Sequence, residues 1–369
     1  MINYLDLYNK NNEIKIPKIF HFIWIGPNKL PLEYQKYIKS WIYNHPDWLI
    51  RIWTDKDINE KNFSNIEYIL KAKKYAQKAD IMRYEIIYNY GGVYLDIDFV
   101  CYKNIEELLN GEFITCNGDF DCIDKSVISM CFFASTINNE ISKKLVDEIK
   151  NTTINIKSVN IETGPYYFGK IVNQFNDFIK LEPRLLYPHT YNEFHNNDKN
   201  IIENKKKAYG EHLWSNSWNN DKKYELYQKP KYIIYTSNNK DIYDMYISLK
   251  KYYDVYIIIN QYDNYELINN DIKNKYNNIE EIIDYIKINK NDIVILNDIY
   301  NKFKEYTEKC YLIYNDNYDI NNFEKIICYN SLCAKKLKKI YTNKEIYYIP
   351  KCINNKDIYH QYLYQLELD

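Results

Sequence analysis

The segment Asp80-Ile-Met-Arg-Tyr84, followed by Gly91-Gly-Val-Tyr-Leu-Asp-Ile-Asp98, is the most informative part of this chain. It predicts a helix, a glycine turn that ends the helix, and a short apolar strand with two carboxylates at its end. Because alternate side chains of a strand point to the same side, Asp96 and Asp98 are expected to face one site together. Two neighbouring carboxylates repel each other unless a cation lies between them, which predicts a hard divalent ion.

The segments around this stretch predict alternating strands and helices. Residues 16–26 and 48–55 are expected strands, and Leu32–Asn44 is an expected helix that ends before Pro46. Asp80 and Arg83 lie one helical turn apart and therefore share a face of their helix. A divalent ion at the end of a buried strand can bridge to a diphosphate, so the pattern suggests sugar transfer from a nucleotide sugar.

With these motifs the chain resembles glycosyltransferase family 32, the DXD sugar-binding group. That group includes the yeast initiating α-1,6-mannosyltransferases and enzymes of bacterial capsular polysaccharide biosynthesis. The chain is also similar to the glucosyltransferase domains of the large clostridial toxins. The resemblance covers roughly residues 14 to 220, and its motifs are Ile16-Pro-Lys-Ile19 with His21, Trp24 and Gly26, then Trp53-Thr-Asp55, Ala79-Asp80, Arg83-Tyr84, Gly91 to Asp98, Thr163-Gly-Pro165, Ala208-Tyr-Gly210, His212, Trp214, Ser217 and Trp218.

This resemblance implies an α/β fold of the GT-A type and a retaining reaction with Mn²⁺ or Mg²⁺ as cofactor. It places a metal-site histidine at His212 and a base-stacking tryptophan at Trp24. An arginine fork suits the charged, planar bonding expected of Arg83. The expected metal ligands are Asp98, Asp96 and His212, the expected catalytic residues are Asp96, Asp98 and Arg83, and the expected donor-binding residues are Trp24, Asp80, Arg83, Tyr84, Asp96, Ser217 and Trp218.

Composition limits the other classes of function. The chain has 369 residues, 46% of them hydrophobic, and a net charge of −1, which provides no basic field for nucleic acid. The N-terminus does not read as a signal peptide, and no run of about 18 apolar residues predicts a membrane span. The 8 cysteines form no Cys-x-x-Cys pair and are expected to be reduced and mostly buried. These features favour a cytoplasmic enzyme. The many Lys, Asn, Ile and Tyr residues suggest an AT-rich genome, and if that genome is viral the expected location is the host cytoplasm.

The chain is expected to contain two domains, a GT-A domain over 1–228 and an accessory domain over 229–369. The second domain shows β-α alternation with short apolar runs, which predicts a Rossmann-like parallel sheet. It resembles the N-terminal half of GT-B glycosyltransferases, and a docking role is favoured over a second catalytic centre. Residues 260–278 are expected to form a long loop, and Ser331 is expected to cap a helix.

Three functions remain open from the sequence. The favoured one is a metal-dependent retaining glycosyltransferase that uses a UDP- or GDP-sugar and a glycan, a lipid-linked sugar or a protein as acceptor. The second is a non-catalytic protein that binds sugar nucleotides and docks a partner. The third is a nucleotide-sugar hydrolase, which would turn over equally with and without an acceptor.

Overall fold

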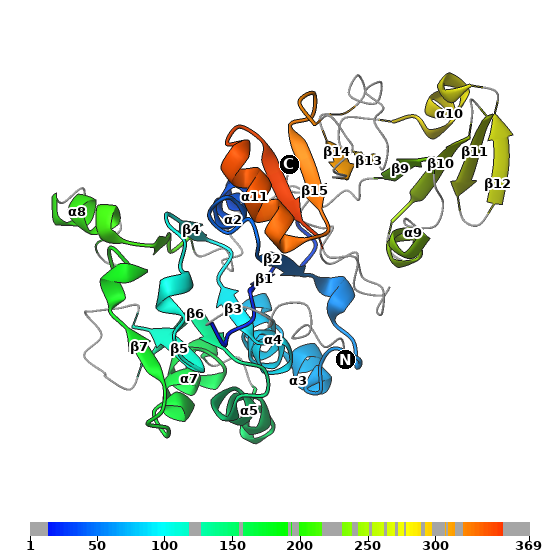
Figure 1. Cartoon of the computed structure of the whole chain (residues 1–369). Coiled ribbons are helices and arrows are strands. Elements are labelled where there is room, and N and C mark those ends of the chain that lie inside the picture. Colours follow the sequence, from blue (N-terminus) through cyan, green and yellow to red (C-terminus); the bar gives the residue numbers. More distant parts are fainter. Residues whose placement is uncertain are drawn as a thin grey trace. The chain divides into compact units, whose positions relative to one another are not determined.

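The structure is a computed structural model that describes residues 14–117, 127–154, 158–190, 193, 199–215, 231–237, 243–250, 253–261, 264–269, 272–276, 278–288, 292–296, 307, 309–313 and 320–349. The chain divides into two compact units, one built mainly from residues 3–45 and 50–226 and the other mainly from residues 227–369 (Figure 1). The expected boundary at 228/229 falls within residues 216–230, outside the described residues, so it stays a prediction.

A six-stranded sheet forms the centre of the first unit, in the order β2-β1-β3-β6-β5-β7. Strand β1 pairs in parallel with β3, and β6 pairs antiparallel with both β3 and β5. All residues of β1, β2, β3 and β5 are buried, because helices cover both faces of the sheet. The strands are β1 (Ile19–Ile23), β2 (Leu49–Trp53), β3 (Gly92–Leu95), β5 (Phe113–Cys116), β6 (Ser129–Ser135) and β7 (Ile179–Leu181).

Helices on the two faces of this sheet bury separate apolar surfaces. On one face α4, α5 and α7 share a buried cluster that includes Met82, Phe133 and Phe168 (Figure 1). On the other face α2 places Trp41 against Phe20 of β1. The expected helix Leu32–Asn44 is confirmed with the same bounds. The helices are α2 (Leu32–Asn44), α3 (Ile66–Lys71), α4 (Tyr75–Tyr90), α5 (Glu140–Asp147), α6 (Val159–Glu162), α7 (Pro165–Val172) and α8 (Lys199–Lys207), with 3₁₀ turns η1 (Asp55–Asp57), η2 (Glu106–Leu108), η3 (Glu148–Asn151) and η4 (Pro183–Leu185).

The glycine turn ends α4 as expected, because Gly91 adopts a φ of 61° that side chains rarely adopt. The continuation differs from the expectation. Strand β3 stops at Leu95, and residues 96–98 form a turn in which Phe99 N donates to Asp96 O at 3.1 Å. The strand periodicity used to align Asp96 with Asp98 was therefore wrong, and a turn positions the two carboxylates.

A small antiparallel ribbon follows this turn. Strand β4 (Phe99–Cys101) pairs with β8 (Gly210–His212), with Phe99 opposite His212 and Val100 opposite Glu211. Because β4 begins one residue after Asp98, this pairing carries the distant His212 directly to the two carboxylates. The ribbon is the element that assembles the candidate site.

The second unit contains an eight-stranded sheet in the order β12-β11-β10-β9-β13-β14-β15-β16. The six strands β10-β9-β13-β14-β15-β16 pair in parallel, and β11 and β12 continue the sheet in antiparallel pairs, so the expected α/β class is confirmed. Its strands are β9 (Tyr232–Thr236), β10 (Val255–Gln261), β11 (Asn264–Asn269), β12 (Ile272–Tyr276), β13 (Ile293–Leu296), β14 (Cys310–Ile313), β15 (Lys325–Cys328) and β16 (Glu345–Tyr348), and its helices are α9 (Tyr243–Leu249), α10 (Ile279–Ile286) and α11 (Ser331–Ile340).

Two local expectations for this unit were wrong. The expected loop over 260–278 contains the antiparallel strands β11 and β12. Pairing between these strands satisfies the backbone hydrogen-bonding groups, although the segment has few apolar side chains. The cap of α11 is Asn330, which accepts from Cys333 N at 3.0 Å, so Ser331 is the first helical residue.

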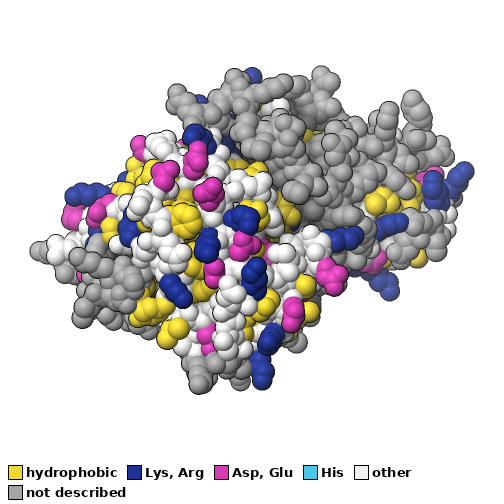
Figure 2. Space-filling model, turned by 90° about the horizontal axis from the view of Figure 1, so that it is seen from below, with side chains coloured by type: hydrophobic (Ala, Val, Ile, Leu, Met, Phe, Trp, Pro, Cys, Tyr) yellow, Lys and Arg dark blue, Asp and Glu magenta, His cyan; other side chains and the backbone are white. Residues whose placement is uncertain are grey.

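Two surface observations concern partners. Among the described residues, no helix has the length and apolar character needed to cross a membrane. On the face shown in Figure 2, basic and acidic side chains of the described residues are interspersed rather than gathered into fields of one sign.

Candidate active site

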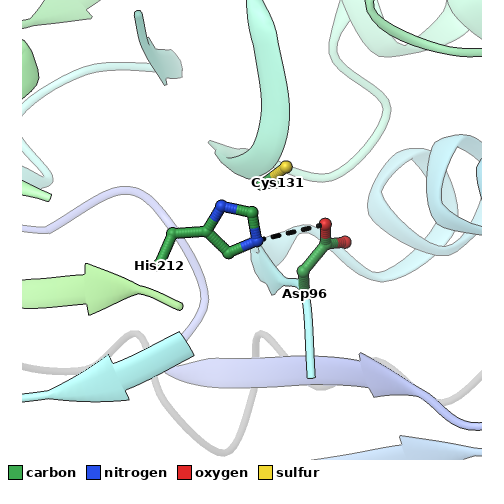
Figure 3. A group of neighbouring side chains, drawn as sticks. All are labelled: Asp96, Cys131 and His212. Atoms are coloured by element: carbon green, nitrogen blue, oxygen red, sulfur yellow. Dashed lines mark ion pairs between the residues drawn. The ribbon is translucent and has the colours of Figure 1, made fainter. Parts of the chain in front are cut away.

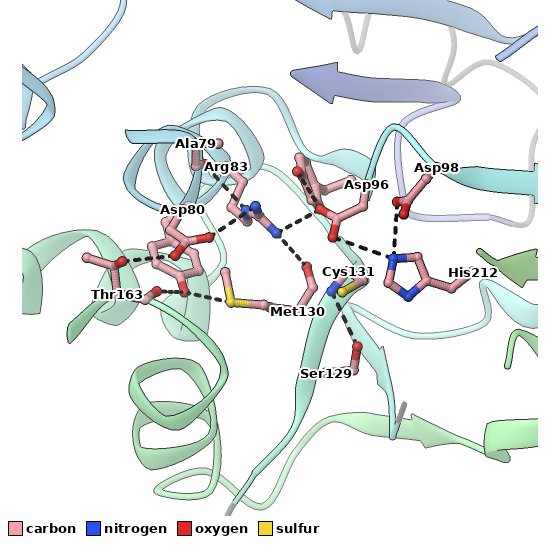
Figure 4. A network of polar contacts seen from close by, with 12 residues as sticks. Ala79, Asp80, Arg83, Asp96, Asp98, Ser129, Met130, Cys131, Thr163 and His212 are labelled. Atoms are coloured by element: carbon pink, nitrogen blue, oxygen red, sulfur yellow. Dashed lines mark hydrogen bonds and ion pairs between the residues drawn. The ribbon is translucent and has the colours of Figure 1, made fainter. Parts of the chain in front are cut away.

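A buried arginine links α4 to the end of β3. Arg83 Nη2 lies 3.0 Å from Asp80 Oδ1, and Nη1 lies 3.0 Å from Asp96 Oδ1 (Figure 4). The same Nη1 donates to the Met130 carbonyl at 3.2 Å, and Nε donates to the Ala79 carbonyl at 3.3 Å. The guanidinium fork therefore fixes both carboxylates in one arrangement.

The outer contacts of the two carboxylates complete this arrangement. Asp80 Oδ2 accepts from Thr163 Oγ1 at 2.9 Å, and Asp96 Oδ1 accepts from Tyr94 Oη at 2.8 Å. Burial raises the pKa of Asp80 to about 6, although Arg83 opposes the shift. Three of the four oxygens of this pair are therefore held by Arg83, Tyr94 or Thr163, and the fourth, Asp96 Oδ2, lies 3.9 Å from His212 Nε2.

His212 reaches the remaining oxygens from β8. Its Nε2 lies 3.1 Å from Asp98 Oδ1 and 3.9 Å from Asp96 Oδ2. Its ring stacks on Phe99 with centroids 5.1 Å apart, which fixes the plane of the imidazole. Burial alone would lower the pKa of His212, but the Asp98 carboxylate, with Asp96 behind it, outweighs burial and raises that pKa.

Ser215 holds the second oxygen of Asp98. Both Ser215 N and Ser215 Oγ donate to Asp98 Oδ2 at 2.8 Å. Trp214, at a φ of 48°, turns the chain after β8 so that both donors reach this oxygen. Burial would raise the pKa of Asp98, but His212 and Ser215 hold it well below its ordinary value.

Cys131 completes the cluster from β6. One ligand atom from each of Asp96, Cys131 and His212 lies within 4.8 Å of the other two (Figure 3). The Asp96 side chain is 24% exposed, against 9% for Asp98 and 6% for His212. Asp96 is therefore the most solvent-accessible of these three side chains.

The charges of the cluster fit a bound cation. Asp80, Asp96 and Asp98 supply three negative charges, and Arg83 supplies one positive charge. A histidine that binds a metal ion is neutral, and with a neutral His212 the formal charge is −2, which a divalent ion would offset. His212 Nδ1 is buried and has no hydrogen-bond partner among the described residues. Oxygen and imidazole donors together suit a divalent metal.

A second histidine–carboxylate pair lies on the other face of the same ribbon. His189 Nε2 is 2.7 Å from Glu211 Oε1, and Lys205 Nζ is also 2.7 Å from this oxygen. Tyr102 Oη donates to Glu211 Oε2. Here one carboxylate faces one ammonium, so the formal charge is already balanced without an added ion.

The remaining expected residues lie in different settings. Trp24 is half-buried, its Nε1 donates to the Asn28 carbonyl at 2.9 Å, and its ring lies beside Tyr34. Tyr84, expected to contact the donor, lies in the core instead. Its hydroxyl donates to the Thr163 carbonyl at 2.6 Å. Ser217 and Trp218 lie outside the described residues.

Sequence reasoning missed Cys131, Ser215 and Tyr34. Cys131 reaches the site through strand pairing, and no local motif marks it. Tyr34 Oη donates to Ser215 Oγ at 3.0 Å, which extends the contacts of Asp98 to α2. Serine occurs at both 215 and 217, and nothing in the sequence indicates that Ser215 is the one that binds the Asp98 carboxylate.

Residues 31–114 match the family model described as "Glycosyltransferase sugar-binding region containing DXD motif". This segment runs from the start of α2 into β5 and includes Asp80, Arg83, Asp96 and Asp98. The resemblance expected from the sequence is confirmed by this match.

Curated relatives agree with it. The chain is 36% identical over 115 residues to inositol phosphoceramide mannosyltransferase 3 of Schizosaccharomyces pombe, which covers 28% of this chain and 32% of that protein. It is 29% identical over 238 residues to an uncharacterized glycosyltransferase of Acanthamoeba polyphaga mimivirus, which covers 60% of this chain and 91% of that protein. A mannosyl phosphorylinositol ceramide synthase of Saccharomyces cerevisiae is 29% identical over 49% of this chain and 50% of its own length. The matches therefore span between a third and a half of the two yeast proteins.

Among solved structures, the chain is similar to the PaToxG glycosyltransferase, with a TM-score of 0.38 and 22% identity over 43% of this chain and 69% of that chain. The glycosyltransferase GlyE of Streptococcus pneumoniae gives a TM-score of 0.36 and 14% identity over 89% of this chain and 100% of its own.

Proposed function

We propose that this chain, which carries the DXD sugar-binding region of glycosyltransferases, moves a sugar from a nucleotide-diphosphate sugar to an acceptor hydroxyl. One observation carries the proposal. Asp96, Asp98 and His212, from two segments more than 100 residues apart, meet beside Arg83 in a cluster with more negative than positive formal charge. Arg83, Asp96 and Asp98 lie within the segment that matches the family model.

In this proposal different residues bind the metal ion, position the carboxylates and face the donor. Asp96, Asp98 and His212 would hold Mn²⁺ or Mg²⁺, and the ion, when bound, would offset the charge that develops on the leaving diphosphate. Arg83 is a positioning residue, because its nitrogens already donate to Asp80, Asp96 and two carbonyls. Asp96, the most exposed carboxylate of the three, would face the donor.

The donor would extend from this cluster toward Trp24. The half-buried Trp24 ring is proposed to stack on the nucleotide base. Asp80, held in place by Arg83, is proposed to orient the sugar, and Ser217 and Trp218 are proposed to close over the diphosphate and exclude water. Retention of anomeric configuration belongs to the same proposal.

The relatives suggest which substrates to try first. Several are named for transfer of mannose to inositol phosphoceramide, so activated mannose is the first donor and an inositol-phosphate lipid the first acceptor to test. Glycans and proteins follow as acceptors. Residues 229–369 are proposed to dock the acceptor or a partner rather than to form a second catalytic centre.

The test is release of nucleoside diphosphate from a panel of UDP- and GDP-sugars with Mn²⁺, Mg²⁺ or EDTA, each with and without acceptor. We expect one donor to turn over, only with metal, and faster when an acceptor is present. Equal turnover with and without any acceptor would indicate a hydrolase instead. Nucleotide binding without turnover would indicate a non-catalytic binding protein.

A further inference from the structure

We propose that Cys131 is a ligand of the metal ion at this site, so that the site offers oxygen, nitrogen and sulfur donors together. Such a site selects a borderline ion of the Zn²⁺ or Co²⁺ class over Mg²⁺, because thiolate is a soft ligand. The inference deepens the proposed function and rests on it only for the use of the ion, since the donor set is defined by this chain alone.

Backbone pairing holds Cys131 at the site. Strand β6 runs antiparallel to β3 with Phe132 opposite Leu95, and Asp96 N donates to the Cys131 carbonyl at 2.9 Å. The ribbon fixes His212 in the same way, through its pairing with Phe99. Asp96 therefore follows the end of β3, Cys131 lies on β6 and His212 lies on β8, so backbone pairing between strands positions all three side chains.

The spacing of the ligand atoms suits one ion after a small adjustment. The three atoms lie within 4.8 Å of one another, and Figure 3 shows the side chains around a common point. A tetrahedral ion with bonds of about 2.0–2.3 Å sets its donors about 3.3–3.8 Å apart. Side-chain rotation alone can supply a shift of about 1 Å, because Asp96 and Cys131 are only partly buried.

Both oxygens of Asp98 already have partners, so a further metal ligand is expected from another side chain. Asp98 Oδ2 already accepts two hydrogen bonds from Ser215, and Oδ1 lies against His212. Asp98 and Asp96 both face His212 Nε2, so an ion bound at this nitrogen would lie between the imidazole and the two carboxylates. Asp96, His212 and Cys131 have ligand atoms close enough to share one ion, so Cys131 adds a donor to the carboxylate and imidazole ligands of the proposed site.

Cys131 also differs from Cys101 and Cys116, the buried cysteines of this unit among the residues that the structure describes. Cys101 Sγ donates to the Lys103 carbonyl at 3.2 Å, and Cys116 Sγ lies 3.5–3.9 Å from several carbonyls. The Cys131 side chain faces the Asp96 carboxylate and the His212 ring instead. Binding of the ion would release the thiol proton to solvent and leave a thiolate on the metal.

Cobalt titration of the metal-free full-length chain, without oxygen, tests the assignment. We expect Co²⁺ to produce a near-ultraviolet thiolate-to-cobalt charge-transfer band in the wild type. Cys131→Ser should lose the band and bind Co²⁺ roughly tenfold or more weakly. Cys333→Ser is the matched control, because Cys333 is also partly exposed but lies on α11, and it should keep the band. Co²⁺ binding without the band, unchanged affinity in Cys131→Ser, or no binding at all would overturn the proposal.

Thiol protection provides a second measurement that needs no variant. Zn²⁺ should slow alkylation of Cys131 by N-ethylmaleimide roughly tenfold or more, as read by mass spectrometry, and should leave Cys333 unaffected. Equal rates with and without Zn²⁺ would contradict a metal–sulfur bond. Neither assay uses a sugar donor. A cobalt–thiolate band without sugar transfer would reject the proposed function alone, and sugar transfer without the band would reject only the ligand.

Discussion

The two faces of the β4–β8 ribbon each carry a buried histidine next to a carboxylate, but the surroundings of the two pairs differ. His189 and Glu211 lie with Lys205, which balances the charge of the carboxylate. His212 and Asp98 lie with a second carboxylate, Asp96, whose Oδ2 is 3.9 Å from the imidazole. Neighbouring residues of a strand point to opposite faces, so Glu211 and His212 belong to different environments.

This difference shows what separates a structural pair from a candidate metal site. A buried histidine–carboxylate contact occurs on both faces and therefore does not identify function. The balance of charge does, because only the His212 face keeps an excess of negative charge after Arg83 is counted. The same face includes Asp96, a carboxylate with 24% of its side chain exposed.

The largest effect is expected from Asp98→Asn. The change removes the negative charge of Asp98, which contacts His212 and is proposed to bind the ion. Metal-dependent turnover should therefore fall about a hundredfold or more. Far-ultraviolet circular dichroism should show an intact fold, because the amide can still accept from Ser215. Asp147→Asn, which removes a surface ion pair with Lys143, should leave turnover unchanged. Near wild-type turnover in Asp98→Asn would remove the distinction between the two faces.

Glu211→Gln should act on stability rather than on chemistry. Removing the charge of a buried carboxylate that pairs with His189 and Lys205 should lower the free energy of unfolding by about 3 kcal/mol. Turnover per folded molecule should stay within a few-fold of wild type. Urea denaturation followed by turnover at matched folded fractions measures both. A loss of metal affinity in this variant would contradict its assignment as structural.

The pH dependence of the same pair sharpens this assignment. Burial would raise the pKa of Glu211, but the hydrogen bonds from His189, Lys205 and Tyr102 outweigh burial and lower it below the ordinary 4.5. Stabilisation by the ionised form is therefore present above about pH 4.5 and is lost as the pH falls through the lowered pKa. The difference in unfolding free energy between wild type and Glu211→Gln should shrink in that acid range. A difference that is constant between pH 7 and pH 3 would contradict this account.

Arg83→Lys should have an intermediate effect. Lysine keeps the charge but cannot bridge Asp80 and Asp96 with a planar fork, so turnover should fall about tenfold through misplaced carboxylates. Metal affinity, measured by calorimetry, should weaken in parallel because Asp96 loses its orientation. Wild-type values for both quantities would show that the fork does not position the site.

The smallest effect is expected from Tyr34→Phe. The change removes the hydrogen bond from Tyr34 Oη to Ser215 Oγ, which should cost about 1 kcal/mol and lower turnover about fivefold. Tyr37→Phe is the control on the same helix, since among the described residues its hydroxyl donates to Glu33 rather than to Ser215. Equal turnover in the two variants would show that α2 does not support Asp98.

Local patterns predicted the elements and the acidic residues of the site. The 3.6-residue periodicity placed Asp80 and Arg83 on one helix face, and the Gly91 turn marked the end of α4. The approach of Asp96 and Asp98 to one point was expected for the wrong reason, because a turn and not a strand brings them together.

Features that depend on tertiary pairing could not be predicted in this way. Cys131 lies opposite the end of β3 only because β6 pairs with that strand, and its sequence context carries no metal motif. The strands β11 and β12 were hidden by Asn, Lys and Tyr, which are common throughout this chain and obscure alternation. At α11, Asn330 and Ser331 are both good caps, and only the backbone geometry decides between them.

The most direct test compares metal-dependent release of nucleoside diphosphate in wild type, His212→Gln and His189→Gln with the donor that turns over. We expect EDTA to abolish turnover in the wild type, His189→Gln to keep metal-dependent turnover per folded molecule, and His212→Gln to lose it. Wild-type turnover that is indifferent to EDTA, or equal turnover in the two variants, would contradict the claim that only the His212 face binds a catalytic cation.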